Sequence, residues 1–213
     1  QQTCGVRNPT TGFSVETNPI YDTLVQEQFQ ELRKTDSRPI LAVMEGWELK
    51  TFVFTPEQYK RGIDVPQLGY GGAHRNVNKM LQELSKSFSL VLVGAPPNMS
   101  QYATVNSPYN LDYTASMLKY CDAFIGSEGG LSNLADGVGG KVIVTSDFLA
   151  QLYGPNGVLQ KRKDPSVGPH IFHPEAGNSL LDPFLTDDEV VSSIETLVLN
   201  NTSVVYDWKQ LVK

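Results

Sequence analysis

The residues best suited to chemistry form a short turn, Ser127-Glu128-Gly129-Gly130, between an apolar run and a helical pattern. Two glycines allow a backbone to approach a ligand closely, and the helix that follows presents unpaired N–H groups and the positive end of its dipole. Such a turn prefers an anion, often a phosphate group. A Gly-Gly pair also makes an ordinary tight connection, so the surrounding residues have to decide between the two interpretations.

The carboxylate of Glu128 would repel a phosphate group, and it suits a hydroxyl-rich group instead. A carboxylate that accepts hydrogen bonds from sugar hydroxyls, with the Gly129 and Gly130 amides on the adjoining phosphate, would fit a nucleotide sugar. The alternative for Glu128 is an acidic residue at a helix N-terminus that interacts only with the helix dipole. The residues themselves leave both alternatives open.

Composition and charge exclude several classes of function. The 213 residues carry a net charge of −6 and no basic block longer than 161–163, which argues against a nucleic-acid or anionic-membrane surface. No apolar stretch approaches the roughly 20 residues that span a bilayer, and no signal-peptide pattern is present. We expect a soluble, cytoplasmic protein, although glycosylation sequons at Asn98, Asn200 and Asn201 leave a secretory origin open.

Four short apolar runs predict the strands that must position the turn: Ile40–Met44, Leu90–Val93, Ala123–Ile125 and Val142–Val144. They are continuous rather than alternating, as in strands that are covered on both faces. Helical patterns are predicted between and around them, over 21–32, 77–88, 113–120 and 131–138, and after a capping box at 186–189. Alternating strands and helices predict an α/β fold, Rossmann-like and doubly wound around a mostly parallel sheet.

The chain divides into three predicted parts. Residues 1–38 form an N-terminal extension with a helix, 39–185 a Rossmann-like nucleotide-sugar-binding domain, and 186–213 a C-terminal helical segment. Within the domain, the proline- and glycine-rich stretch 154–182 is expected to be a long loop.

Ligands of an open parallel sheet bind outside the carboxyl ends of its strands. The predicted strand ends are Glu45-Gly46-Trp47, 94–97, 127–130 and 146–147. Every strand must end in some turn, which explains the glycines and prolines, but it explains the carboxylates of Glu45 and Glu128 less well. Trp47, beside Glu45, and Trp208 could stack on a base or sugar ring, although most aromatic residues in a chain of this size lie in the core or at its rim.

A family resemblance adds to these residues. The segment 111–144, with Ala123-Phe124-Ile125-Gly126-Ser127-Glu128-Gly129-Gly130 and then Asn133-Leu134-Ala135, resembles the C-terminal half of glycosyltransferase family 9, the heptosyltransferase-like enzymes with the GT-B fold. That family carries an acidic strand, an Asn-Asp-Ser/Thr-Gly turn and a His-Leu-Ala helix. The resemblance continues through 153–155 to the helix after Thr186 and covers about residues 75–200.

The resemblance implies a role for individual residues. The family's acidic turn residue falls on Glu128 and its small-Gly pair on Gly129 and Gly130, while the family's helix histidine falls on Asn133. Arg75, or its neighbour His74, stands where the family places a basic phosphate contact. The predicted donor-binding residues are therefore Ser127, Glu128, Gly129, Gly130, Arg75 and Glu45.

The family further implies a nucleoside-diphosphate sugar as substrate, a glycan or lipid-linked acceptor, and no metal or other cofactor. A complete GT-B enzyme has two Rossmann domains, and residues 1–38 cannot form the first one. We therefore expect either the donor half of a longer protein or partner complex, or a short relative without the usual base; no catalytic base is nominated. A non-catalytic binding module on the same fold is the alternative function.

Histidine and cysteine residues suggest weaker sites. His170 and His173 have a ligand-like spacing, but a structural role is favoured over a metal site because prolines flank them and no Cys or Asp cluster is near. Cys4 and Cys121 could form one disulfide, and two free thiols are favoured.

Overall fold

The computed structural model describes residues 14–44, 46–47, 51–58, 72–93, 102–106, 110–127, 129–145, 178–204 and 206. Its strands are β1 (Ile40–Met44), β4 (Ser89–Val93), β5 (Val105–Asn106), β6 (Ala123–Gly126), β7 (Val142–Val144) and β8 (Ser179–Leu180), with β2 (Phe52–Val53) and β3 (Ala73–His74) forming a separate antiparallel pair. Its principal helices are α1 (Pro19–Thr35), α3 (Val77–Ser87), α4 (Leu111–Tyr120), α5 (Gly130–Gly137) and α8 (Asp187–Leu199). The four predicted strands and five predicted helices are all present.

The main sheet is parallel throughout, with the strand order β5-β4-β1-β6-β7-β8. The chain begins in the centre at β1, moves outward to β5, crosses back to β6 and moves outward again to β8. This is the strand order of doubly wound dinucleotide-binding folds, in which the direction of winding switches between the two central strands. The predicted Rossmann-like α/β class is therefore confirmed, and the switch point lies between β1 and β6.

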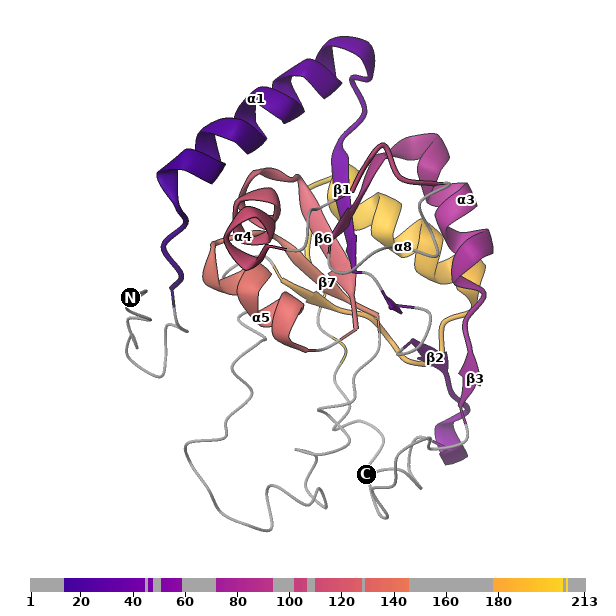
Figure 1. The fold of residues 1–213 in the computed structure, drawn as a ribbon. Coiled ribbons are helices and arrows are strands. Elements are labelled where there is room, and N and C mark those ends of the chain that lie inside the picture. Colours follow the sequence, from indigo (N-terminus) through magenta and orange to yellow (C-terminus); the bar gives the residue numbers. More distant parts are fainter. Residues whose placement is uncertain are drawn as a thin grey trace, which may run out of the picture.

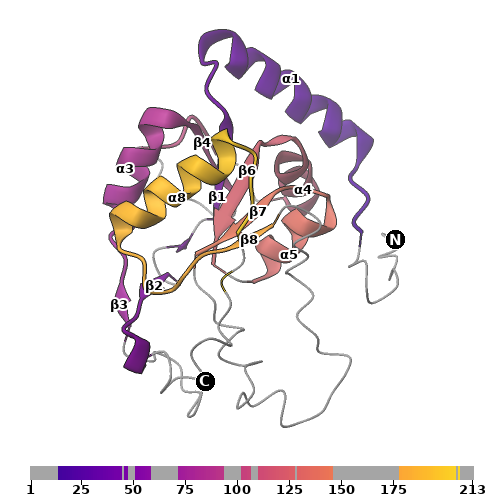
Figure 2. The ribbon, with the colours of Figure 1, turned by 180° about the vertical axis from the view of Figure 1, so that it is seen from behind.

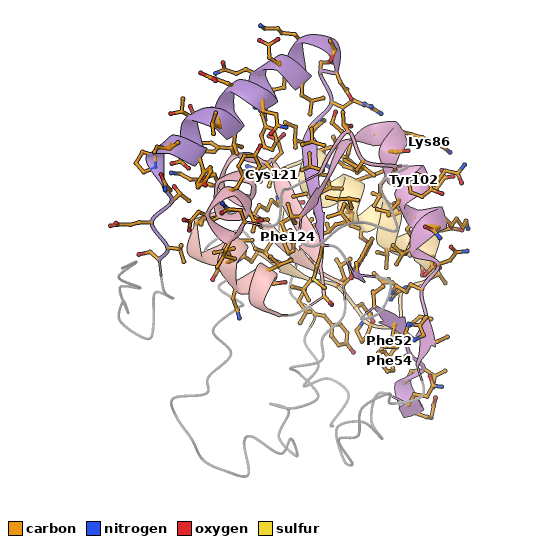
Figure 3. All side chains as sticks on the ribbon, in the orientation of Figure 1. Phe52, Phe54, Lys86, Tyr102, Cys121 and Phe124 are labelled. Atoms are coloured by element: carbon orange, nitrogen blue, oxygen red, sulfur yellow. The ribbon has the colours of Figure 1, made fainter. Side chains whose placement is uncertain are left out.

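Helices cover both faces of the sheet (Figure 1, Figure 2). α3 and α8 pack together on one face, while α4 and α5 lie on the other, with α1 against α4. The strand residues of β1, β4, β6 and β7 are buried, as their continuous apolar runs predict. Phe124 lies among the side chains that fill the centre of the fold (Figure 3), and it is fully buried.

Side chains cap most of the helices. The predicted capping box is formed, because Glu189 N donates to Thr186 Oγ1 (3.3 Å) and Thr186 N donates to Glu189 Oε2 (2.7 Å). Asparagine side chains cap α1, α3 and α4 through Asn18, Asn76 and Asn110. These caps satisfy N–H groups that the first turn of a helix cannot pair internally.

The structure adds a strand where the sequence predicts a loop. β8 falls at the carboxyl end of the 154–182 stretch, and its Leu180 is buried. A strand of two residues is too short to show a periodic pattern. The residue before β8, Asn178, is polar but buried. Its Oδ1 accepts a hydrogen bond from Val142 N (3.0 Å), and its Nδ2 donates to Asp136 (2.7 Å). The rest of the predicted loop, 154–177, lies outside the described residues.

Two further predictions can be compared with the structure only in part. Within the described ranges, no helix is long and apolar enough to cross a membrane. Cys121 follows α4 as a free thiol, and burial raises its pKa to about 12. Cys4 lies outside the described residues, so the state of that thiol stays a prediction.

Asp36, in the turn between α1 and β1, should make stability depend on acid pH. Its carboxylate accepts hydrogen bonds from Arg38 Nε (2.8 Å) and from the Ser89 hydroxyl, and the Arg38 bond holds its pKa well below the usual range. A lowered pKa in the folded state stabilises the fold above the pKa of an unfolded aspartate, about 3.9, and this contribution disappears as the pH falls further. We expect Asp36→Asn to lower the free energy of unfolding by the same amount at every pH between about 5 and 7.

In urea titrations, the difference in the free energy of unfolding between the wild type and Asp36→Asn should shrink progressively below about pH 4. A difference that stays constant down to about pH 2 would contradict this role of the Asp36 charge.

Candidate functional site

Four strands end side by side at one edge of the sheet, as the sequence predicts. β4, β1, β6 and β7 are consecutive and parallel, so their carboxyl ends meet there, and α3, α5 and α8 begin at the same edge (Figure 1). The chain leaves β1 toward α3 on one face and leaves β6 toward α5 on the other. In folds of this class that divergence creates the ligand-binding crevice. Glu45 and Glu128, the two predicted carboxylates, lie outside the described residues.

The turn after β6 packs tightly against β1. A Cβ atom added to Gly126 would lie 2.8 Å from Met44 Cβ, so only glycine allows this approach. Ser127 is 3% exposed, and its Oγ lies 3.9 Å from Met44 Sδ. Its carbonyl accepts a hydrogen bond from Ser132 Oγ (2.7 Å), which fixes the turn to the first turn of α5.

No side chain of the described residues caps the N-terminus of α5. Its N-cap residue is Gly129 (φ 157°, ψ −167°), which supplies no side-chain cap, and the first intrahelical hydrogen bond runs from Asn133 N to Gly129 O. The N–H groups of 130–132 therefore have no intrahelical acceptor. Apart from the chain neighbours and the helix backbone, no atom of the described residues lies within 4 Å of the positions that Cβ atoms would take on Gly129 and Gly130. Among the described helices whose caps are given above, α5 alone lacks a side-chain cap.

Asn133, which the resemblance aligns with the family's helix histidine, adds a polar atom to this region. Its Oδ1 is buried and has no hydrogen-bond partner among the described residues. A buried acceptor without a partner is uncommon in native proteins and commonly marks a functional group.

Arg75 lies in the connection that leads into α3, and its side chain is 0% exposed. Its Nη1 donates to Leu185 O (2.7 Å) and to Asp187 Oδ1 (3.3 Å), and the Asp187 carboxylate also accepts from Asn76 N (2.9 Å). Burial lowers the pKa of Arg75, which the Asp187 charge opposes, and an arginine stays protonated in any case. The Nε and Nη2 atoms are buried without a partner in the described part of the chain. These two form the side-on fork that binds carboxylates and phosphates in bidentate fashion.

Trp47 does not lie where a stacking residue would. It is fully buried, and its indole Nε1 donates to Thr145 Oγ1 (2.6 Å), directly after β7. Thr145 Oγ1 lies 3.1 Å from Thr51 Oγ1 and 3.3 Å from Gly126 O. Thr51 O in turn accepts from Arg75 N (3.2 Å). A continuous chain of hydrogen bonds thus joins the end of β6 to Arg75.

The β2–β3 pair belongs to the same connection between β1 and α3. Phe52 belongs to β2, and Phe54 follows the strand and lies near Phe52 (Figure 3). Phe52 packs on His74 of β3, with ring centroids 4.5 Å apart. Phe54 N donates to Pro183 O (3.1 Å), which attaches the pair to the segment before α8. The connection is therefore joined to itself through Arg75 N and Thr51 O and to the segment before α8 through Phe54 N and Pro183 O.

Sequence patterns miss three of these residues. Thr51 and Thr145 are small polar residues, and the only signal at Thr145 is its position directly after the apolar run of β7. Asp187 is recognisable as an acidic first-turn residue of α8, but nothing in the pattern shows that it meets Arg75, 112 positions away. The structure describes no group of three or more potential metal ligands within its ranges, and His170 and His173 lie outside them.

Comparisons with known proteins bear on the fold. Neither protein-family models nor curated protein sequences match the chain. Among solved structures, it is similar to a crystal structure of a family 9 glycosyl transferase from Veillonella parvula, with a TM-score of 0.50 and 14% sequence identity, over 89% of this chain and 55% of that one. The chain thus spans about half the length of the solved structure that it matches, and it has a glycosyltransferase-like fold.

Proposed function

We propose that this chain binds a nucleoside-diphosphate sugar at the switch point and is the donor-binding part of a glycosyltransferase. The observation that carries the proposal is the N-terminus of α5, which opens at the switch point without a side-chain cap. Diphosphate oxygens would accept hydrogen bonds from the N–H groups of residues 130–132 and would interact favourably with the helix dipole. The family 9 structure supports this choice through its fold.

Arg75 supplies the second element. In the proposal, the Nε and Nη2 atoms of Arg75, which are buried without a partner among the described residues, donate hydrogen bonds to the diphosphate. Hydrogen bonds through Thr51 and Thr145 connect the backbone of Arg75 to Gly126, at the end of β6. In the proposed reaction, these donors would stabilise the charge that develops on the leaving diphosphate as the sugar is transferred.

Carboxylates would select the sugar. In the proposal, Glu128 and Glu45 accept hydrogen bonds from sugar or ribose hydroxyls, while Ser127 lines the same turn. Helix amides and Arg75 provide the charge stabilisation that a metal would otherwise supply, so the proposal includes no metal. A glycan or a lipid-linked group is the proposed acceptor, and a further domain or partner would bring it together with the catalytic base.

A pair of variants at Gly130 tests the anion site. Gly130→Asp places a negative charge in the first turn of α5, which should stabilise the helix by about 0.3–1 kcal/mol. The same charge would repel a diphosphate, so we expect the affinity for UDP, GDP or ADP to fall at least about tenfold while the melting temperature is unchanged or higher. Isothermal titration calorimetry and thermal denaturation measure the two effects.

Gly130→Asn is the matched control, because asparagine has nearly the same size without the charge. It should retain most of the affinity, since no atom of the described residues outside the helix backbone and the chain neighbours would lie within 4 Å of a Cβ on residue 130. Equal affinities for the two variants would contradict an anion site at α5. If the wild type binds no nucleoside diphosphate, the alternative of a non-catalytic module on this fold is favoured.

A further inference from the structure

One buried hydroxyl joins the two chain connections that diverge at the switch point. Thr145 is 0% exposed, and its Oγ1 contacts Trp47 Nε1 (2.6 Å), Thr51 Oγ1 (3.1 Å) and Gly126 O (3.3 Å). Trp47 and Thr51 belong to the connection from β1 to α3, whereas Gly126 begins the turn from β6 to α5.

The chemistry of the partners fixes the direction of each hydrogen bond. An indole N–H can only donate, and a backbone carbonyl can only accept. A hydroxyl has one donor and two acceptor sites. All contacts are satisfied together only if Trp47 and Thr51 donate to Thr145 and Thr145 donates to the carbonyl of Gly126. Thr145 then uses its whole hydrogen-bonding capacity, and each bond depends on the others.

We infer that Thr145 is the positioning residue of the switch-point site, because it sets the Ser127–Gly130 turn relative to the connection that carries Arg75. The Gly126 carbonyl accepts from both Thr145 N (3.0 Å) and Thr145 Oγ1, while Met44 fixes Gly126 from the other side. Thr51 extends the link, since its carbonyl accepts from Arg75 N. This inference rests on the proposed function, because the positioned groups are the proposed diphosphate donors.

Thr145→Val tests the inference, because valine keeps the shape of threonine and removes the hydroxyl. We expect the Val variant to bind the preferred diphosphate among UDP, GDP and ADP about tenfold more weakly, since misplaced donors lose affinity. Thr145→Ser keeps the hydroxyl and should bind within about twofold of the wild type. Ile194→Val, a buried truncation on α8, controls for a general loss of stability and should leave the affinity unchanged.

Amide chemical shifts of the ligand-free proteins give a second readout. In Thr145→Val, shifts should change in both connections, at 126–130 and at 51 and 75, and the Trp47 indole N–H should exchange faster with solvent. Thr51→Val removes one donor only and is the milder variant if Thr145→Val does not fold; its changes should centre on residues 51 and 75.

Unchanged affinity in a folded Thr145→Val protein would overturn the inference, as would amide changes confined to β7. If the wild type binds none of the three diphosphates, the proposed function fails, and the amide shifts alone then decide whether Thr145 couples the two connections.

Discussion

Replacing Asp187 with alanine should cost about 3 kcal/mol of the free energy of unfolding. Arg75 has a fully buried side chain, and Asp187 is the carboxylate that neutralises it. Without that carboxylate, the guanidinium would remain buried with Leu185 O as its partner, and Asn76 N would lose its acceptor. Leaving one charge of a buried pair uncompensated is strongly destabilising. Urea titration followed by circular dichroism measures the loss.

Asp188→Ala is the matched control for this prediction. Asp188 stands next to Asp187 in the first turn of α8, so both variants lose the same kind of interaction with the helix dipole. Its ion pair with Lys79 is exposed on both sides, and such pairs contribute about 0–1 kcal/mol. Equal losses in the two variants would show that the Arg75–Asp187 pair has no special weight.

Trp47→Ala should destabilise the protein by about 3–5 kcal/mol, the range found when large buried aromatic side chains are truncated. The indole is fully buried over the ends of the strands, and its removal leaves a cavity and deprives Thr145 of a donor. A side chain exposed for stacking, one of the two alternatives that the sequence leaves open for Trp47, would lose less than about 0.5 kcal/mol. Thermal and urea denaturation distinguish these two expectations.

Trp47→Phe separates packing from hydrogen bonding. Phenylalanine refills most of the volume but has no N–H group, so we expect a smaller loss of about 1–3 kcal/mol. If the Phe and Ala variants lost the same free energy, burial of the ring would contribute nothing, contrary to the packing seen around Trp47.

The framework of the fold is predictable from the sequence because its signals are local. Continuous apolar runs gave the central strands, and the capping box at Thr186 located α8. β5 and β8 are not predictable in this way, because strands of two residues have no period and depend on neighbours far along the chain. The polar but buried Asn178 shows this, since its partners lie on β7 and α5.

The sequence predicts where the candidate site lies in the fold, but not which side chains contact one another there. The predicted parallel sheet places the Ser127–Gly130 turn at the carboxyl ends of its strands, where such sheets bind ligands, and the structure has that parallel sheet. The sequence leaves the burial of Trp47 open, because its position after a strand does not show its contact with Thr145, 98 positions away. The contacts of Thr145 with Trp47 and Thr51, and of Arg75 with Asp187, join residues 94 to 112 positions apart, and residue types alone cannot indicate such pairs.

A titration of ¹⁵N-labelled protein with nucleoside diphosphates tests the central claim most directly. We predict that UDP, GDP or ADP shifts the backbone amide resonances of Gly130, Leu131 and Ser132, whose N–H groups are open at the start of α5, and the side-chain Nε–H resonance of Arg75. Saturable shifts centred on these groups would support a diphosphate site at the switch point. Absence of shifts there at millimolar ligand, or shifts centred on another part of the molecule, would contradict it.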